Sequence, residues 1–267
     1  MARRTVGVCL LALAGLLQAC ATSHADFADR IDPLLPADVI LLGEQHDAAD
    51  HQRLQRATVL ELARRQQLAA LLIEMAEQGR STLGLPRDAP EAQVQRALQW
   101  RDAGWPWADY GPVVMAAVRA GVPVLGANLA REAMRAAMAN PALDTLLSPG
   151  DFAQQRDSIR SGHCMLLPEG QITPMTRIQI ARDVAMASAI TGAVQPGKTV
   201  LLVAGGGHVV RSRGVPAHMP TTLRTLVVLA VAGKADAADR AHADVVWETA
   251  ALPPKDYCAA LEKQLKR

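Results

Sequence analysis

The chain has 267 residues, half of them apolar and 3% aromatic, and its formal charge at pH 7 is +2. Arg3 and Arg4 account for that charge, and the remaining sequence is neutral, without a basic patch or a long run of one charge. A nucleic-acid partner is therefore not expected. The length suits one large domain or two small ones.

The first twenty residues resemble the signal of a bacterial lipoprotein. Two arginines precede an apolar run, residues 6–17, that is too short to span a bilayer, and Leu17-Gln18-Ala19-Cys20 follows. Such a signal implies that Cys20 is lipidated and anchors the chain in the cell envelope, with Ala21 matching the pattern for the outer membrane, facing the periplasm. Gln18 is unusual at its position, so plain secretion after signal cleavage is the alternative.

After a linker, residues 21–37, we expect a single α/β domain over residues 38–267. Its first strand, residues 39–42, is an unbroken apolar run that stops at a glycine and is followed by Glu44 and His46. In α/β folds ligands bind beyond the carboxyl ends of strands, so these two side chains can share a pocket. The alternative is a polar turn in which Asp47 caps the next helix.

A helix over residues 48–66 leads to a second buried strand, residues 68–73, which also ends at a carboxylate, Glu74. A single glutamate at such a position is usually exposed to solvent, but two strands that both end at a carboxylate favour a shared site. Past a helix at residues 91–101, three tryptophans and Tyr110 fall within eleven residues. For the tryptophans we favour a hydrophobic anchor for an insertion, and the alternative is a flat apolar wall for a planar ligand.

The next segments are a helix (112–119), a third strand (122–127) and an alanine-rich helical stretch (129–160). His163 and Cys164 follow in a loop, before a helix over residues 174–193. Cys164 and Cys258 are the two cysteines left once the signal and Cys20 are set aside. In an oxidising periplasm such a pair is more often a structural disulfide than a catalytic thiol.

The fourth strand, residues 199–204, runs into three glycines and His208, so this histidine emerges at the same edge as Glu44 if the strands are parallel. The glycine spacing does not fit a Rossmann fingerprint. Strands at 223–231 and 244–247 and a terminal helix at 256–266 complete the chain. The alternation predicts an α/β fold: a mostly parallel central sheet with helices on both faces, plus helical insertions.

Four strand-end residues therefore form the candidate site: Glu44, His46, Glu74 and His208. Two histidines with carboxylates can run general acid–base chemistry, or can hold a divalent metal, here through His46, His208 and Glu44. One hypothesis is thus a metal-assisted hydrolase of protease or esterase type with these four residues as catalytic groups.

These motifs, in the same order over residues 38–220, resemble the ChaN-type haem-binding lipoproteins, a group related to the Tiki-type proteases. The resemblance rests on Gly43-Glu44-Gln45-His46, Glu74-Met75, Trp107-Ala108-Asp109-Tyr110, Arg182-Asp183 and Ala204-Gly205-Gly206-Gly207-His208. It implies a haem-binding protein of the envelope that serves iron acquisition, as a homodimer with haem near the interface, and an outer-membrane haem receptor or transport components as partners.

The resemblance also raises the question of a haem ligand. Tyrosinate is an established axial ligand of ferric haem, and the chain contains only Tyr110 and Tyr257. Tyr110 lies inside the region of resemblance and is the predicted ligand, with His163 as its partner or substitute. We favour haem binding without catalysis over the hydrolase hypothesis.

Overall fold

The computed structural model describes residues 27–265. The predicted signal, Cys20 and the linker up to residue 26 lie outside these residues. The chain divides into two compact units, Met1–Leu35 and Pro36–Arg267. The first contains a short 3-10 helix, η1 (Asp32–Leu34), and the second contains all the strands and the candidate site. In the described part of the chain, no helix is both long enough and apolar enough to cross a membrane.

Six strands form one sheet in the order β3-β2-β4-β1-β5-β6, and every pairing between them is parallel. This confirms the predicted α/β class. The strands keep the predicted order along the chain, with bounds that differ from prediction by a few residues. They are β1 (Val39–Glu44), β2 (Leu68–Glu77), β3 (Val124–Asn128), β4 (Thr199–Gly205), β5 (Thr225–Ala232) and β6 (Val245–Thr249).

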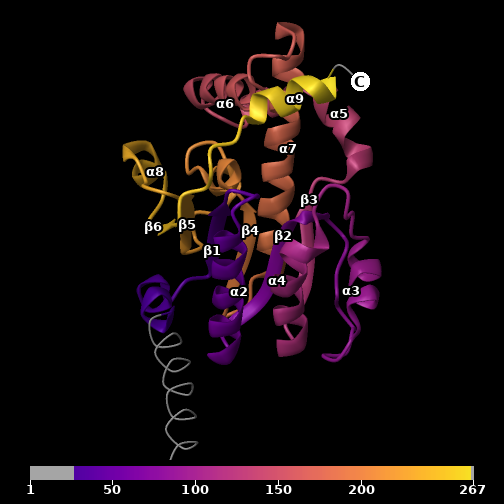
Figure 1. Cartoon of the computed structure of the whole chain (residues 1–267), viewed down its shortest axis with the longest axis vertical. Coiled ribbons are helices and arrows are strands. Elements are labelled where there is room, and N and C mark those ends of the chain that lie inside the picture. The colour runs from indigo at the N-terminus through magenta and orange to yellow at the C-terminus, as the bar shows by residue number, and fades with distance from the viewer. Residues whose placement is uncertain (1–26, 266–267) are drawn as a thin grey trace, which may run out of the picture. The chain divides into compact units, whose positions relative to one another are not determined.

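Helices fill the connections between the strands (Figure 1). Because parallel crossovers are right-handed, connections that run in opposite directions along the sheet place their helices on opposite faces. The step from β1 through β2 to β3 runs one way, carrying α2 and α4, and the return from β3 to β4 carries α7. The helices are α2 (Ala49–Arg64), α3 (Glu91–Leu98), α4 (Trp107–Ala120), α5 (Met134–Ala139), α6 (Pro149–Gly162), α7 (Glu169–Ala193), α8 (Ala237–His242) and α9 (Tyr257–Leu265), with short 3-10 helices η2 (Arg131–Ala133), η3 (Pro141–Thr145), η4 (Gly206–Val209) and η5 (Val215–His218).

The centre of the sheet is the hydrophobic core. Every residue of β1 and of β4 is buried. A strand covered by helices on both faces needs apolar side chains at successive positions, which is why these strands appear in the sequence as continuous apolar runs. The connection after β1 leaves in one direction and the connection after β4 in the other, so a crevice opens at their carboxyl ends. Glu44 and His208 lie at this crevice.

Two helices begin earlier than predicted. The sequence places proline at the start of each helix, at Pro112 and Pro174, because proline is favoured in a first turn. In the structure both prolines lie inside longer helices, α4 and α7. The extra turn of α4 is held by residues outside that helix: Asp102 accepts a hydrogen bond from the Trp107 backbone, and the Trp107 indole donates to Glu91. Helix α8 was not predicted; a capping box between Asp236 and Asp239 starts it.

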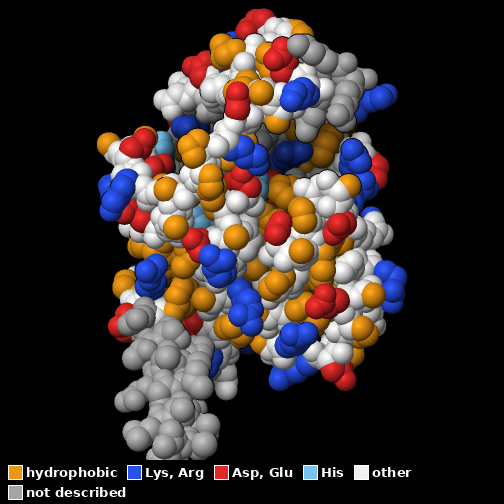
Figure 2. All heavy atoms as spheres, viewed as in Figure 1, with side chains coloured by type: hydrophobic (Ala, Val, Ile, Leu, Met, Phe, Trp, Pro, Cys, Tyr) orange, Lys and Arg blue, Asp and Glu red, His pale blue; other side chains and the backbone are white. Residues whose placement is uncertain are grey.

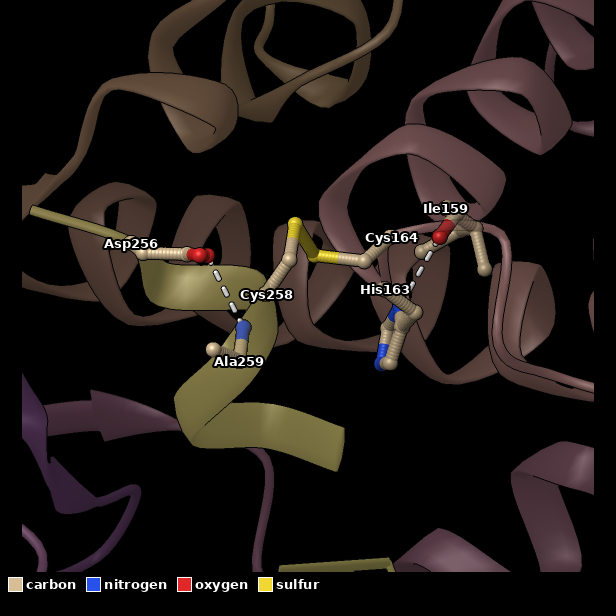
Figure 3. The surroundings of a disulfide bond; sticks show 6 residues. All are labelled: Ile159, His163, Cys164, Asp256, Cys258 and Ala259. Atoms are coloured by element: carbon tan, nitrogen blue, oxygen red, sulfur yellow. Dashed lines mark hydrogen bonds between the residues drawn. A yellow bond between two sulfur atoms is a disulfide. The ribbon is translucent and has the colours of Figure 1, made fainter. Parts of the chain in front are cut away.

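Cys164 and Cys258 form a disulfide, as the sequence predicted, with their Cα atoms 5.6 Å apart (Figure 3). The bond joins the chain just after α6 to the first turn of α9. It therefore closes a loop across a sequence separation of 94 residues. Figure 2 shows acidic and basic side chains interspersed over the face that it draws, in keeping with the neutral composition.

Candidate active site at the carboxyl edge of the sheet

The structure brings the four predicted strand-end residues together. Glu74 lies between the two histidines: its Oε2 is 3.9 Å from His46 Nε2, and its Oε1 is 3.4 Å from His208 Nε2. His46 also bonds to Glu44. Three strands that are far apart in sequence thus deliver two carboxylates and two imidazoles to one place, as expected for the carboxyl ends of parallel strands.

Glu44 is the most heavily hydrogen-bonded carboxylate of the site. Its Oε1 accepts from the Tyr110 hydroxyl at 2.7 Å and from His46 Nδ1 at 2.8 Å. Its Oε2 accepts from the side-chain amides of Gln52, at 2.9 Å, and Gln55, at 2.5 Å. Both glutamines belong to α2, so the helix that follows β1 turns its buried face back toward the strand end. A buried carboxylate needs this number of donors to replace its water shell.

His46 is the accessible member of the cluster. Its side chain is 41% exposed, whereas that of Glu44 is fully buried. Because Nδ1 is held by Glu44, Nε2 is the nitrogen that can meet a ligand. Burial lowers the pKa of His46, but the hydrogen bond to Glu44 and the charges of Glu74 and Glu44 raise it above its ordinary value. The ring packs edge-on against Trp105, with 4.7 Å between the ring centroids.

Behind His46 lies a buried chain of charges formed by Glu74, His208 and Asp183. The Nδ1 atom of His208 donates to Asp183 Oδ1 at 2.5 Å. Burial lowers the pKa of His208, but the charges of Glu74 and Asp183 raise it more, to about 10. Burial opposes the ionisation of Glu74, yet His208 and His46 hold the pKa of Glu74 down at about 2. His208 is therefore a buried imidazolium held between two carboxyl groups.

The glycines before His208 allow this close packing. The backbone amide of Gly205 donates to Glu74 Oε2 at 2.8 Å. A Cβ atom at position 205 would lie 2.8 Å from His46 Nε2, closer than a side chain can approach. Only glycine leaves room for the imidazole and the carboxylate over the end of β4.

The two predicted haem ligands lie in different surroundings. Tyr110 is 3% exposed and its hydroxyl donates to Glu44. Burial and the Glu44 charge raise the pKa of Tyr110 far above its ordinary range, so the hydroxyl would have to leave Glu44 before it could bind a metal as phenolate. His163 caps the end of α6 next to the disulfide, where its Nδ1 donates to the carbonyl of Ile159 at 2.8 Å (Figure 3).

The predicted divalent metal site finds no support in the geometry. Among residues 27–265, no group of three or more His, Cys, Asp or Glu side chains is arranged to hold a metal ion. The donors of Glu44, His46 and His208 are instead turned toward one another. The Nδ1 atom of His46 is hydrogen-bonded to Glu44. The Nδ1 atom of His208 is hydrogen-bonded to Asp183, and its Nε2 lies next to Glu74.

A cavity of about 640 Å³ opens beside the cluster. Glu74 and Trp105 belong to its wall, and both also contact His46. The remaining wall combines apolar and basic side chains: Met75, Ala76, Ala103, Leu129, Met134, Arg101, Arg131 and Arg182, together with Glu77, Gly104 and Asn128. Of the clustered tryptophans, Trp105 thus fits the predicted apolar wall, while Trp107 lines a separate hollow over α2 and α4.

Two buried polar atoms in this wall have no hydrogen-bond partner within the described residues: Arg182 Nε and Asn128 Oδ1. Buried polar groups are almost always paired in native proteins. These two atoms have almost no accessible surface, so they can bond a ligand or water in the cavity once their side chains turn toward it. A guanidinium in such a position suits a carboxylate.

Several residues that hold the site were not among the predicted site residues, although Asp183 belongs to the motifs that carry the family resemblance. Asp183 and Gln179 lie on α7, and Gln179 Nε2 is 3.1 Å from His208 Nδ1. Apart from the Arg182-Asp183 motif, the sequence gives no signal for them, because polar side chains on a helix are normally exposed to solvent. His51 is fully buried and its Nδ1 accepts from the Gln45 backbone at 3.0 Å, so it fixes the loop that carries His46.

Comparison with known proteins locates the same region. A sequence model of the family described as haem-binding uptake, Tiki superfamily, ChaN matches residues 31–219. A solved structure titled "Cofacial heme binding to ChaN of Campylobacter jejuni" superposes with a TM-score of 0.68 and 27% identity, covering 82% of this chain and 90% of that one. The type III effector HopBA1 shares the fold at a TM-score of 0.50 and 18% identity, over 80% of this chain and 88% of its own. Comparison with curated protein sequences gives no match.

Proposed function

The chain belongs to the ChaN family of haem-binding uptake proteins within the Tiki superfamily, and on that premise we propose that it binds haem in the cavity beside His46. The observation that carries the proposal is the wall of that cavity, which joins an apolar surface to three arginines. Trp105, Met75 and Met134 offer apolar contacts for a flat ring, while Arg182 offers a buried, unpaired Nε. Haem has both features, because its ring is apolar and its two propionates are anionic.

The axial ligand is a prediction that the variants below test. Tyr110 remains our predicted ligand, with His163 as partner or substitute. In the present arrangement Tyr110 donates to Glu44, whereas the His46 side chain is 41% exposed and lies against two residues of the cavity wall, Glu74 and Trp105. Imidazole and phenolate both ligate haem iron. His46 therefore joins the residues to be changed.

An absorbance titration with ferric haem tests the proposal. The wild-type chain should give a saturable Soret band, and replacing the residue that ligates iron should change the band's position and weaken binding by about tenfold or more. The variants are Tyr110→Phe, His163→Ala and His46→Ala, with His242→Ala as a histidine control on α8. Arg182→Ala should weaken binding without moving the band, with Arg56→Ala as its control. A wild-type chain that shows no saturable band contradicts haem binding.

We also propose that the protein works in the cell envelope, lipidated at Cys20, and serves iron or haem acquisition by exchanging haem with an outer-membrane receptor or transport components. The predicted signal and the family support this. Incorporation of a labelled fatty acid that is lost in Cys20→Ser would demonstrate the anchor. Light scattering with and without haem tests the expected homodimer, since a ligand shared between two copies should make the dimer depend on haem.

A second candidate function, hydrolysis, is favoured by one observation. The pairing of His46 Nδ1 with Glu44 orients the ring, so that Nε2, which lies 3.9 Å from Glu74 Oε2, is the nitrogen that would take a proton from water as a general base. In that case Glu44 orients the base, and the buried His208 and Glu74 fix its surroundings. Screening the purified protein against ester and peptide substrates, with Glu44→Ala as the inactive variant, decides this candidate.

A further inference from the structure

The C-terminal segment is bonded to the loop that carries His46. The Tyr257 hydroxyl donates to Asp47 Oδ2 at 2.8 Å and accepts from the Gln45 side chain at 3.3 Å. Lys255 Nζ donates to the same Asp47 oxygen at 3.0 Å. The residues on both sides of His46 are thus held by a segment about 210 positions later in the chain.

The disulfide fixes this segment in place. Cys258 directly follows Tyr257 and is bonded to Cys164, at the end of α6 (Figure 3). Asp256 starts α9 by accepting a hydrogen bond from the Ala259 backbone at 2.9 Å. Tyr257 therefore sits between a helix start and a covalent cross-link, which leaves its ring little freedom to leave the loop.

Little else holds the segment. Residues 253–260 are all exposed, and α9 has only nine residues, too few for a stable isolated helix. The hydrophobic burial that secures long helices such as α4 and α7 is therefore missing from this part of α9. The cross-link and the polar bonds to Gln45 and Asp47 take its place. The residues matched by the family model end at 219, so the segment lies beyond them.

The loop under Tyr257 is itself exposed. Gln45, His46 and Asp47 are all exposed residues, in contrast to the buried strand that precedes them. The His51 ring fixes the loop at its start through the Gln45 backbone, and Trp105 and Glu44 contact only the His46 ring. The His46 carbonyl accepts a hydrogen bond from the Gln52 side chain, and the Gln45 carbonyl accepts one from the Ala48 backbone, both at 3.0 Å. The Asp47 side chain is held by Tyr257 and Lys255, and at 3.3 Å by Gln45.

We propose that Tyr257 is a positioning residue for His46, and that the Cys164–Cys258 disulfide holds Tyr257 in this role. The orientation of the imidazole toward the cavity then depends on a residue outside the sheet. The choice of haem as the ligand rests on the proposed function, but the positioning itself does not.

Two measurements on the purified full-length chain test the proposal. The first is hydrogen exchange of the backbone amides of residues 45–51 without any ligand, and the second is the ferric haem titration. Tyr257→Phe removes only the hydroxyl, and the double variant Cys164→Ser, Cys258→Ser removes the cross-link. Lys234→Ala is the control, because it removes an exposed bond to Glu248 that does not involve residues 45–51 or the C-terminal segment.

We expect Tyr257→Phe to speed exchange at residues 45–51 and to weaken haem binding, each by about tenfold, because a hydrogen bond to a carboxylate is lost. The Soret maximum should also shift, which a change in fold stability alone would not produce. The cysteine variant should act in the same direction. If exchange and affinity stay at the wild-type values in Tyr257→Phe, the proposal is overturned. This result decides the question even if the cysteine variant fails to fold. If the wild-type chain binds no haem, the proposed function fails while the exchange data still decide the positioning.

Discussion

At the scale of single residues, Gly205 is the position where sequence and site geometry are most tightly linked. A Cβ atom there would lie 2.8 Å from His46 Nε2 and 3.5 Å from Glu74 Oε2. Gly205→Ala should therefore push the imidazole away from the cavity and weaken haem binding by about tenfold or more. Gly207→Ala is the matched control, because a Cβ at position 207 meets nothing within 4 Å. Equal affinities in the two variants would show that the imidazole is not needed where it lies.

The buried imidazolium of His208 makes a prediction about pH. Its pKa is raised from 6.5 to about 10, so its charge stabilises the fold fully below pH 6.5, and this contribution is lost as the pH rises through 10. The pKa of Glu74 is lowered from 4.5 to about 2, so its contribution is present above pH 4.5 and is lost as the pH falls through 2.

The free energy of unfolding, measured with urea across this range, should therefore fall below about pH 4.5 through Glu74 and above about pH 6.5 through His208. Burial raises the pKa of Asp183 from 3.8 to about 6, so this carboxyl adds a decline as the pH rises from 3.8 to 6. His208→Gln should lower the stability at neutral pH and remove the decline between pH 6.5 and 10. A wild-type stability that stays constant from pH 6.5 to 10 would contradict a charged His208 in the folded protein.

The sequence predicted the residues that leave strands but not those that support them. Glu44, Glu74 and His208 follow apolar runs, and that position alone places a side chain at the crevice of a parallel sheet. Asp183 gives no comparable signal, because an acidic residue on a helix normally faces water. Only the packing of α7 against the end of β4 shows that it is fully buried beside His208. The His46 contact with Trp105 is likewise set by tertiary packing.

At the scale of elements, β4 is the strand on which the site most depends. It pairs with both β1 and β2, and all of its residues are buried. Leu202→Ala in its middle removes a fully buried side chain, so we expect a loss of about 2–5 kcal/mol in the free energy of unfolding. Leu83→Ala, at a position 68% exposed, should change stability by less than about 0.5 kcal/mol. Urea unfolding of both variants measures the difference, and similar values for the two would refute this assignment of the core.

The bounds of two helices were predicted wrongly from the sequence pattern. Strand existence and order followed from apolar runs, whereas the starts of α4 and α7 were misplaced at prolines. Proline in a helix interior costs a hydrogen bond, so sequence alone favours a boundary there. The first turn of α4 exists because Asp102 and Glu91 bond to Trp107, and neither residue belongs to that helix.

At the scale of the whole molecule, the Cys164–Cys258 bond restricts the unfolded chain over a long loop. Removing it with serine at both positions should lower the free energy of unfolding by about 2–4 kcal/mol, mainly because the unfolded state gains entropy. Calorimetry under oxidising conditions, and again with a reductant, provides the comparison. The reduced wild-type chain should melt with the serine variant, and a wild-type melting temperature that ignores the reductant would show that the cross-link contributes no stability.

The strand order has a consequence for how this protein can be made. Strands β1 and β2 are not neighbours; β4, residues 199–205, inserts between them. When β1, β2 and β3 have been synthesised, the strand that pairs with both β1 and β2 is still missing. The sheet therefore cannot be completed until residue 205 has left the ribosome. Late synthesis of the central strand therefore leaves β1 separate from β2 and β3 until most of the polypeptide has been made.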